Sequence, residues 1–420
     1  MADRPTLIVR ARLLLPLRRP PIENGAVVIR GDRLAAVGNW RSLRARHAGQ
    51  IHDLGEVILM PGLVNAHCHL DYTDMAGLFA PPRRFSDWIK LITTEKAHWT
   101  FSDYAQSWIN GANMLVRSGS TTVADIEAVP ELLPDVWSAT PLRVFSFLEM
   151  TGVRSRRDPD SILREAAEKI DALPSRRCHA GLSPHAPYST TPKLLQRCAA
   201  AARRRQWRVT THIAESATEF EMFRQGSGEM FDWLKRNQRI MTDCGKRSPV
   251  QQLAQTHLLG PNLLAVHVNY LAPGDAALLA RKRVSVVHCP RSHDFFQHQD
   301  FPFAKLNRAG VNLCLGTDSL ATVTTSRRRP VELNLFAELR QFAKKHPGVP
   351  AEHVLRMATL NGARALGMAG DIGELSRGAF ADLIALPFAG KPAESYAAAV
   401  EHTGDVAASM IDGHWAIPPK

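Results

Sequence analysis

Two features are missing from this 420-residue sequence: an apolar run of the roughly 18–20 residues that span a bilayer, and a C-x-x-C pair. Arg10 and Arg12 interrupt the apolar stretch TLIVRARLLLPLRRPP, which favours paired strands over a signal peptide. The six cysteines are scattered through mostly apolar runs, as is typical of free thiols in a reducing cytoplasm. We therefore expect a cytoplasmic protein with no membrane partner.

Recognisable nucleic-acid modules are also missing, although the formal net charge is +12. The basic clusters RSLRARH, AARRRQW and SRRRP lie next to helix ends or in loops, without interleaved aromatics or zinc-finger spacing. We interpret this charge as solvated surface and expect no nucleic-acid partner. A polyanion-binding protein is the non-enzymatic alternative, and its affinity would fall steeply with salt.

Short apolar runs alternate with helical periodicity between Pro61 and about Gly370. The predicted strands are Leu63–His69, Thr121–Glu127, Arg143–Glu149, Cys178–His185, Arg208–Glu215, Leu263–Tyr270, Val284–Arg291 and Val311–Asp318. The predicted helices between them include Asp103–Ser118, Asp160–Leu173, Thr191–Arg205, Gly274–Arg283 and Val331–Lys345. Eight β/α repeats indicate an α/β fold, a (β/α)₈ TIM-type barrel. An open doubly wound sheet is disfavoured because no glycine-rich dinucleotide fingerprint follows the first strand.

The two ends of the chain have a different character. GAVVIRGDRLAAVG near the N-terminus and ASMIDGHWAIP near the C-terminus are short alternating runs around Gly-Asp or Asp-Gly, which is hairpin chemistry. We expect them to combine into a small β-sandwich. The predicted division is 1–60 and 370–420 for the sandwich and 61–369 for the barrel.

Polar side chains recur at or near the carboxyl ends of the predicted strands. They are His67 and His69, Asp125 and Glu127, Glu149, His185, His212 and Glu215, His267, His288 and Asp318. A single histidine at a strand end is more often structural than a ligand. Eight strands marked at the same end are hard to explain as independent coincidences, because that end of a barrel is where active sites are built.

One subset has the composition of a metal site. His67 and His69, at i and i+2 of a strand, point to the same face. With His212 and Asp318 they supply three imidazoles and one carboxylate, which suits Zn²⁺ or Fe²⁺ better than Mg²⁺ or Ca²⁺. Glu215 lies three residues beyond His212, close enough to lean over such an ion, and His267 on the next strand is placed to orient its bound water.

The sequence resembles the amidohydrolase superfamily, in the branch of nucleoside and nucleobase deaminases and chlorohydrolases. The motifs that carry the resemblance run in family order over nearly the whole chain: PGLVNAHCHL, SPHAPYSTT, THIAES, LLAVHVNYL, VVHCPRS, LGTDSLAT and ATLNGARALGMAGDIGELSRGAFADL. The resemblance implies a barrel with a sandwich from both termini and one divalent metal ion, Zn²⁺ or Fe²⁺. It implies His67, His69, His212 and Asp318 as ligands, Glu215 as proton shuttle and His267 as partner of the metal-bound water.

Several details narrow this branch or depart from it. The fourth strand, CHAGLSPH, has no lysine, which favours one metal ion over the two bridged by a carboxylated lysine. The H-x-E and P-C-x-x-C pattern of the other zinc deaminases is missing. His293 stands where relatives usually have asparagine, and the long segment Ser216–Asn262 is expected to form a loop and helix over the pocket.

These residues suit hydrolytic deamination. Attack of activated water on an amino-bearing ring carbon releases ammonia only after proton transfer, and a carboxylic acid can carry the proton. Glu215 is the predicted carrier, and its alternative role is a carboxylate stabilised at a helix N-terminus. Asp318 and His267 would orient the attacking hydroxide, and Asp318 would pass the second proton to the amine.

The resemblance is closest to deaminases of adenosine-like compounds, with aminodeoxyfutalosine first and methylthioadenosine or adenosylhomocysteine second. Glu95 and His185 occupy the places of the ribose-binding glutamate and the nucleoside-contacting histidine, although Glu95 is alternatively an exposed helix residue. A guanine or cytosine deaminase, or a triazine chlorohydrolase, would share the metal site without needing Glu95. We expect a small-molecule substrate and a homodimer is plausible.

Overall fold

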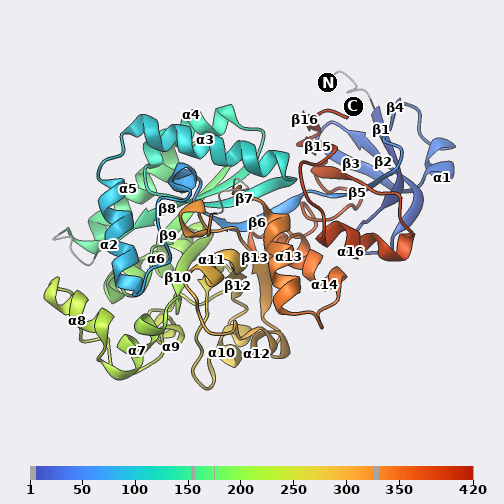
Figure 1. The fold of residues 1–420 in the computed structure, drawn as a ribbon. Coiled ribbons are helices and arrows are strands. Elements are labelled where there is room, and N and C mark those ends of the chain that lie inside the picture. Colours follow the sequence, from blue (N-terminus) through green and yellow to red (C-terminus); the bar gives the residue numbers. More distant parts are fainter. Residues whose placement is uncertain (1–5, 153–156, 175, 326–330, 420) are drawn as a thin grey trace.

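The computed structural model describes residues 6–152, 157–174, 176–325 and 331–419, which form two sheets (Figure 1). The larger body contains eight parallel strands in the order of the sequence. They are β6 (Leu63–Cys68), β7 (Ser120–Glu127), β8 (Arg143–Met150), β9 (His179–Pro184), β10 (Val209–Ile213), β11 (Leu263–His267), β12 (Ser285–His288) and β13 (Asn312–Leu315). Their residues are almost all buried, as expected for strands covered on both faces.

The first and last strands meet at a seam that closes the barrel. The carbonyl oxygen of His67 accepts hydrogen bonds from the backbone N–H groups of Thr317 (3.0 Å) and Asp318 (3.1 Å). The buried Asn65 side chain donates to Thr317 Oγ1 at 2.8 Å and accepts from its N–H at 3.0 Å. The predicted (β/α)₈ barrel is therefore confirmed.

Helices surround this barrel in the predicted alternation. The first group is α2 (Phe85–Lys96), α3 (Phe101–Arg117), α4 (Leu133–Ala139), α5 (Pro159–Ala172) and α6 (Pro192–Arg205). The second is α7 (Ala217–Gln225), α8 (Glu229–Arg236), α9 (Pro249–Gln255), α10 (Asp275–Arg281), α11 (Pro290–Phe295), α12 (Phe303–Arg308), α13 (Leu335–Lys345), α14 (Ala351–Met357) and α15 (Leu360–Ala365). Local chemistry sets several starts, such as the reciprocal Thr100–Asp103 capping box of α3. No helix within the described ranges is long and apolar enough to cross a membrane.

The second sheet is built from both ends of the chain, which lie side by side at one end of the molecule (Figure 1). Its order is β16 (His414–Ile417), β15 (Ala408–Ile411), β14 (Leu383–Pro387), β5 (Val57–Pro61), β1 (Thr6–Leu14), β2 (Ile22–Arg30) and β3 (Arg33–Asn39), with β4 (Gln50–Asp53) also pairing with β1. The short helices α1 (Trp40–Arg44) and α16 (Ser395–Val400) flank these strands in the sequence.

Both predicted hairpins are present in this sheet. Gly31–Asp32 joins β2 to β3, and Asp412–Gly413 joins β15 to β16 with positive φ at both residues. The expected strand pair in TLIVRARLLLPLRRPP is wrong, because this stretch supplies the single strand β1. The β-rich unit built from both termini is confirmed, and the exact division at 60 and 370 stays a prediction.

The predicted strands were too long at their carboxyl ends. The chain leaves the sheet after Ile213, His267, His288 and Leu315, two or three residues before the expected ends at Glu215, Tyr270, Arg291 and Asp318. Ala214, Val268 and Asp318 have positive φ of 49°, 52° and 54°, which extended strands do not adopt. Glu215 and Asp318 therefore lie beyond the strands, at the barrel mouth.

Gly316 allows the close approach of the two strands at the seam. A Cβ at this position would lie 2.7 Å from the carbonyl oxygen of His67 and 2.9 Å from its Cβ. Gly316→Ala should therefore lower the free energy of unfolding by about 1–3 kcal/mol, the usual cost of overpacking. Denaturant unfolding measures this. Gly348→Ala is the matched control, because its Cβ would meet nothing within 4 Å. Equal stabilities of the two variants would contradict the tight seam.

Candidate metal centre and active site

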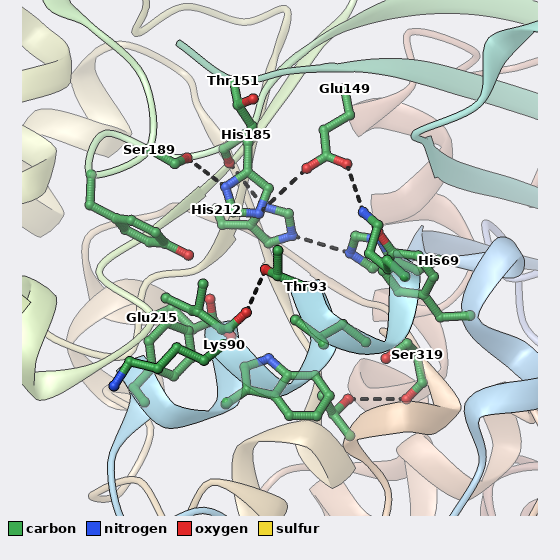
Figure 2. Close-up of a pocket in the computed structure, with 18 of the residues that line it drawn as sticks. His69, Lys90, Thr93, Glu149, Thr151, His185, Ser189, His212, Glu215 and Ser319 are labelled. Carbon is green, nitrogen blue, oxygen red and sulfur yellow. Dashed lines mark hydrogen bonds and ion pairs between the residues drawn. The ribbon is translucent and has the colours of Figure 1, made fainter. Parts of the chain in front are cut away.

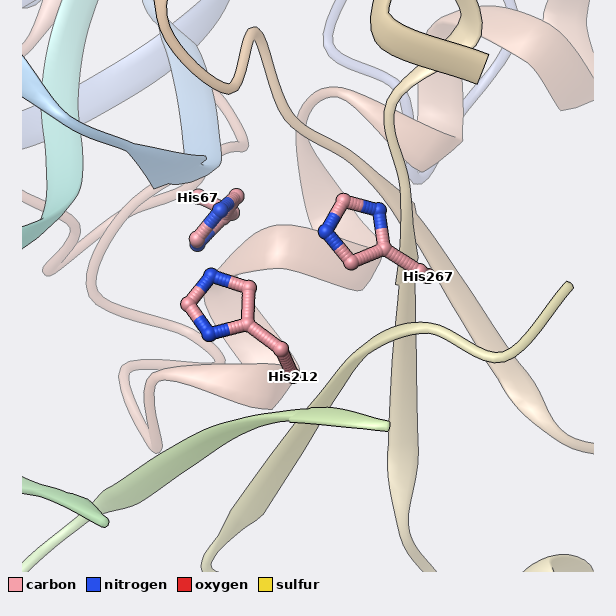
Figure 3. Close-up of side chains that lie close together, drawn as sticks. All are labelled: His67, His212 and His267. Carbon is pink, nitrogen blue, oxygen red and sulfur yellow. The ribbon is translucent and has the colours of Figure 1, made fainter. Parts of the chain in front are cut away.

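Six of the predicted site residues converge at the carboxyl end of the barrel. Asp318 Oδ1 lies 3.6 Å from His67 Nε2 and 3.8 Å from His69 Nε2. His69 Nε2 faces His212 Nε2 at 3.3 Å, and His267 Nε2 lies 3.4 Å from Glu215 Oε1. Figure 3 shows the rings of His67, His212 and His267 around one small space.

Hydrogen bonding at its far side prepares His212 to act as a ligand. Its Nδ1 lies 2.9 Å from the carbonyl oxygen of His185, which can only accept. Nδ1 therefore carries the proton, and Nε2 presents a lone pair to the space facing His69. Two imidazole nitrogens at 3.3 Å would repel one another if both were bare, unless a cation lies between them.

Asp318 is fixed by a strained backbone and by hydroxyl groups. Its φ of 54° lies in the left-handed region, and such strain is common at functional sites. Ser292 Oγ donates to Oδ2 at 2.6 Å, and Thr322 Oγ1 donates to the same oxygen at 3.4 Å. Oδ1 is left facing the histidines. Burial opposes ionisation here, but the neighbouring imidazoles of His67, His267 and His69 hold the pKa of Asp318 well below its usual value.

The donor set fits one transition-metal ion. Both ring nitrogens of His67, which is 1% exposed, lack a hydrogen-bond partner in the described structure, a costly arrangement for a buried imidazole. Burial and the adjacent His67 lower the pKa of His69 to about 3, so the ring is neutral and can donate a lone pair. The ligand atoms of His67, His69 and Asp318 lie within 4.8 Å of one another, as do those of His67, His212 and His267.

Glu215 lies beside this set, immediately before α7. Its backbone N–H donates to Glu219 Oε2 at 2.9 Å, and its carbonyl accepts from Asn269 Nδ2 at 2.9 Å. Burial, followed by the negative charges of Asp318 and Glu219, raises the pKa of Glu215 well above its usual value. A carboxyl group with a raised pKa can carry a proton near neutral pH.

His69, His212, Glu215, His267 and Asp318 form the floor of a cavity of about 770 Å³ (Figure 2). Its aromatic lining includes Tyr72, Phe85, Trp88, Tyr188 and Trp233. Lys96, Glu149, Thr151, His185 and Ser189 also line the cavity, and this group is called the polar wall. A volume of this order and a mainly apolar lining with a few polar groups are typical of small-molecule sites.

His185 lies in the polar wall, as the sequence predicts. Its Nδ1 lies 2.7 Å from Ser189 Oγ, and its Nε2 faces Glu149 Oε1 at 3.8 Å. Burial lowers the pKa of His185, and Glu149 partly opposes this. The sequence indicates no role for the other four residues of the polar wall, Lys96, Glu149, Thr151 and Ser189, although Glu149 is one of the polar residues at strand ends.

Glu95 does not reach the cavity. Its Oε1 accepts a hydrogen bond from Trp99 Nε1 at 3.2 Å, one helical turn further along the chain. Thr93, Thr94 and Lys96 line the cavity, whereas Glu95 does not. The predicted contact of Glu95 with ribose stays a prediction, and the structure does not bring the side chain to that place.

His293 and the segment Ser216–Asn262, whose roles the sequence leaves open, have defined places in the structure. His293 Nδ1 lies 3.1 Å from Asn269 Oδ1, and its Nε2 lies 2.8 Å from the carbonyl oxygen of Gln299. Asn269 in turn binds the carbonyl of Glu215. The segment Ser216–Asn262 forms three short helices, and Trp233 and Leu234 of α8 line the cavity, so the expected cover over the pocket is present.

The barrel, its appended terminal sheet and its histidine–aspartate floor define the class: a hydrolase of carbon–nitrogen bonds built on a (β/α)₈ barrel. The family comparison assigns the chain more closely. The family described as "Amidohydrolase family" matches residues 58–416, and the chain belongs to it.

Similar proteins have been named as nucleoside deaminases. A 5-methylthioadenosine/S-adenosylhomocysteine deaminase of Syntrophobacter fumaroxidans is 33% identical, over 87% of this chain and 80% of that protein. A 5'-deoxyadenosine deaminase of Methanoregula boonei is 30% identical, over 81% and 74%. The crystal structure of an adenosine deaminase from Xanthomonas campestris with bound zinc has a TM-score of 0.84 and 25% identity, covering 98% and 93%.

The donor geometry predicts about one tightly held Zn²⁺ or Fe²⁺ per chain, measured by elemental analysis of purified protein. His67→Ala should lose most of this metal, because the His67 ring faces the other ligands and has no other partner. His185→Gln is the matched control and should retain the ion, because the His185 carbonyl rather than its ring supports His212. Two tightly held ions, or full occupancy in His67→Ala, would contradict the site.

Proposed function

We propose that this protein is a metal-dependent hydrolytic deaminase of an adenosine-like nucleoside. The observation that carries the proposal is the Glu215 carboxyl group beside a set of three histidines and an aspartate, on the floor of a cavity of about 770 Å³. Relatives at 30–33% identity that are named as deaminases of methylthioadenosine, adenosylhomocysteine and 5'-deoxyadenosine support the substrate class.

His67, His69, His212 and Asp318 would hold the metal ion. When bound, such an ion supplies Lewis acidity, which makes water a competent nucleophile near neutral pH. The four side chains are buried and rigidly placed, so little reorganisation is needed during the reaction.

Glu215 moves protons in the proposed mechanism. It takes a proton from the attacking water and delivers it to the ring nitrogen next to the amino-bearing carbon. This transfer lets the carbon become tetrahedral without building full negative charge on the purine. Its raised pKa brings the carboxyl group closer to the working pH, where general acid–base catalysis is most effective.

His267 and Asp318 orient the attacking oxygen. His267 Nε2 lies 3.4 Å from Glu215 Oε1, so a water molecule bound beside the two side chains would contact both. Asp318 is placed to pass the second proton to the departing amine, which leaves as ammonia. The hydroxyl of Ser292 on Oδ2 keeps Oδ1 directed at the reacting atoms.

Other reactions of the same family remain alternatives. A guanine or cytosine deaminase or a triazine chlorohydrolase would use the same floor with a different wall. Among nucleosides, methylthioadenosine is supported by the named relatives. The aminodeoxyfutalosine-type compound that the sequence ranks first stays a prediction.

An ammonia-release screen of metal-replete protein across purine nucleosides, free purines, cytosine and chlorotriazines tests these alternatives. Turnover of a free base ahead of every nucleoside would overturn the proposal.

Glu215→Gln should abolish turnover while the metal content stays near that of the wild type. The substitution keeps the shape of the side chain but removes the proton carrier, so kcat should fall by at least ~10²–10⁴-fold. Steady-state ammonia release and elemental analysis on the same sample measure the two quantities.

Glu221→Gln on α7 is the matched control, because Glu221 does not line the cavity. Its kcat should equal that of the wild type. If Glu215→Gln also retained activity within a few-fold, Glu215 would be excluded as the proton carrier.

A further inference from the structure

The polar wall of the cavity contains one carboxylate outside the metal floor, that of Glu149 at the end of β8. Its side chain is 13% exposed, and its two oxygens face different partners. Oε1 lies 3.8 Å from His185 Nε2, and Oε2 lies 3.9 Å from Lys96 Nζ. Both distances exceed the 2.7–3.2 Å of a hydrogen bond. Among the described residues, Glu149 therefore has charged and polar neighbours but no donor at hydrogen-bonding distance.

His185 lies on one side of Glu149. Its Nδ1 is held by Ser189 Oγ at 2.7 Å. Its Nε2 faces Glu149 Oε1 across 3.8 Å, a gap wider than a hydrogen bond. A ligand hydroxyl group in this gap can donate a hydrogen bond to Oε1.

The partner on the other side is a cation with donors to spare. Lys96 Nζ donates to the hydroxyl oxygen of Tyr72, and it lies 4.8 Å from the centre of the Tyr72 ring. Tyr72 stacks on His69 at 5.1 Å, so the lysine is anchored to the metal floor through one aromatic ring. Two of the three N–H donors of the ammonium group are left for Glu149 and for a ligand.

We propose that Glu149 is the acceptor for the vicinal 2′,3′-diol of the nucleoside ribose, with Lys96 as the residue that positions it. This inference rests on the proposed function, because it assigns a place in the cavity to the sugar of the substrate. One hydroxyl group donates to Glu149 Oε1, on the side that faces His185. The other donates to Oε2 and accepts from Lys96. Glu95, one residue before Lys96, faces away and takes no part.

The test compares substrates that differ only in the diol. Adenosine or 5′-methylthioadenosine, whichever turns over, is paired with its 2′,3′-dideoxy counterpart. Hydrogen bonds to a charged group are worth about 10- to 100-fold in kcat/KM, so the wild type should prefer the diol by at least that factor. In Glu149→Gln this ratio should fall to about 3-fold or less, through loss of activity on the diol substrate alone.

Glu95→Gln is the comparison variant and should keep the wild-type ratio. Glu149→Asp serves if Glu149→Gln does not fold, and it should lower the ratio because the shorter side chain cannot reach both hydroxyl groups. Lys96→Met should also lower the ratio, and Lys96→Arg should restore part of it. Metal content, measured on each variant, should be unchanged, which separates a role in sugar recognition from damage to the floor.

Three outcomes would overturn the inference. The wild type could turn over the dideoxy compound within about 3-fold of the diol, or the ratio could collapse in Glu95→Gln and persist in Glu149→Gln. Either result leaves deamination itself intact. If metal-replete wild type releases ammonia from no nucleoside, the proposed function fails, and the assignment of Glu149 fails with it.

Discussion

The arrangement of the site depends on one contact, the seam where β6 meets the residues after β13. There the backbone carbonyl oxygen of His67 accepts hydrogen bonds from the backbone N–H groups of Thr317 and Asp318. This backbone pairing places Asp318 Oδ1 3.6 Å from the His67 ring although the two residues are 251 positions apart. Closure of the barrel thus brings two of the candidate metal ligands together.

The neighbours of two buried carboxylates on the floor shift their pKa values in opposite directions. Asp318 and Glu215 are both buried carboxylates, and desolvation raises the pKa of each. Asp318 lies among imidazoles and hydroxyl donors, so its pKa is held low and it is suited to metal ligation. Glu215 lies near other carboxylates, so its pKa rises further and it is suited to carrying a proton. Environment alone gives two acidic residues on one floor different roles.

The sequence predicts the barrel and the floor well for a physical reason. Strands buried on both faces are nearly continuous apolar runs, and parallel strands bring their carboxyl ends to one side, so polar residues at those ends can be grouped without coordinates. The seam is different. The pairing of Asn65 with Thr317 links residues 252 positions apart and leaves no local pattern. Asp125 also marks a strand end, yet it accepts hydrogen bonds from Leu70 N, just after β6, and from Trp108 Nε1 of α3, and so has a structural role.

Predicting the residues that line the cavity requires the direction of each side chain on α2 as well as its position in the sequence. Trp88, Ile92 and Lys96 recur at i, i+4 and i+8 of α2 and all line the cavity, as one face of a helix does. Glu95 shares its face with Leu91, which is 46% exposed, so the helical period directs Glu95 away from the cavity. The same period directs Lys96 inward, towards Glu149 on β8. A carboxylate from a barrel strand and a cation from the helix after the first strand thus reach the same part of the cavity, and the helix supplies the cation rather than the carboxylate.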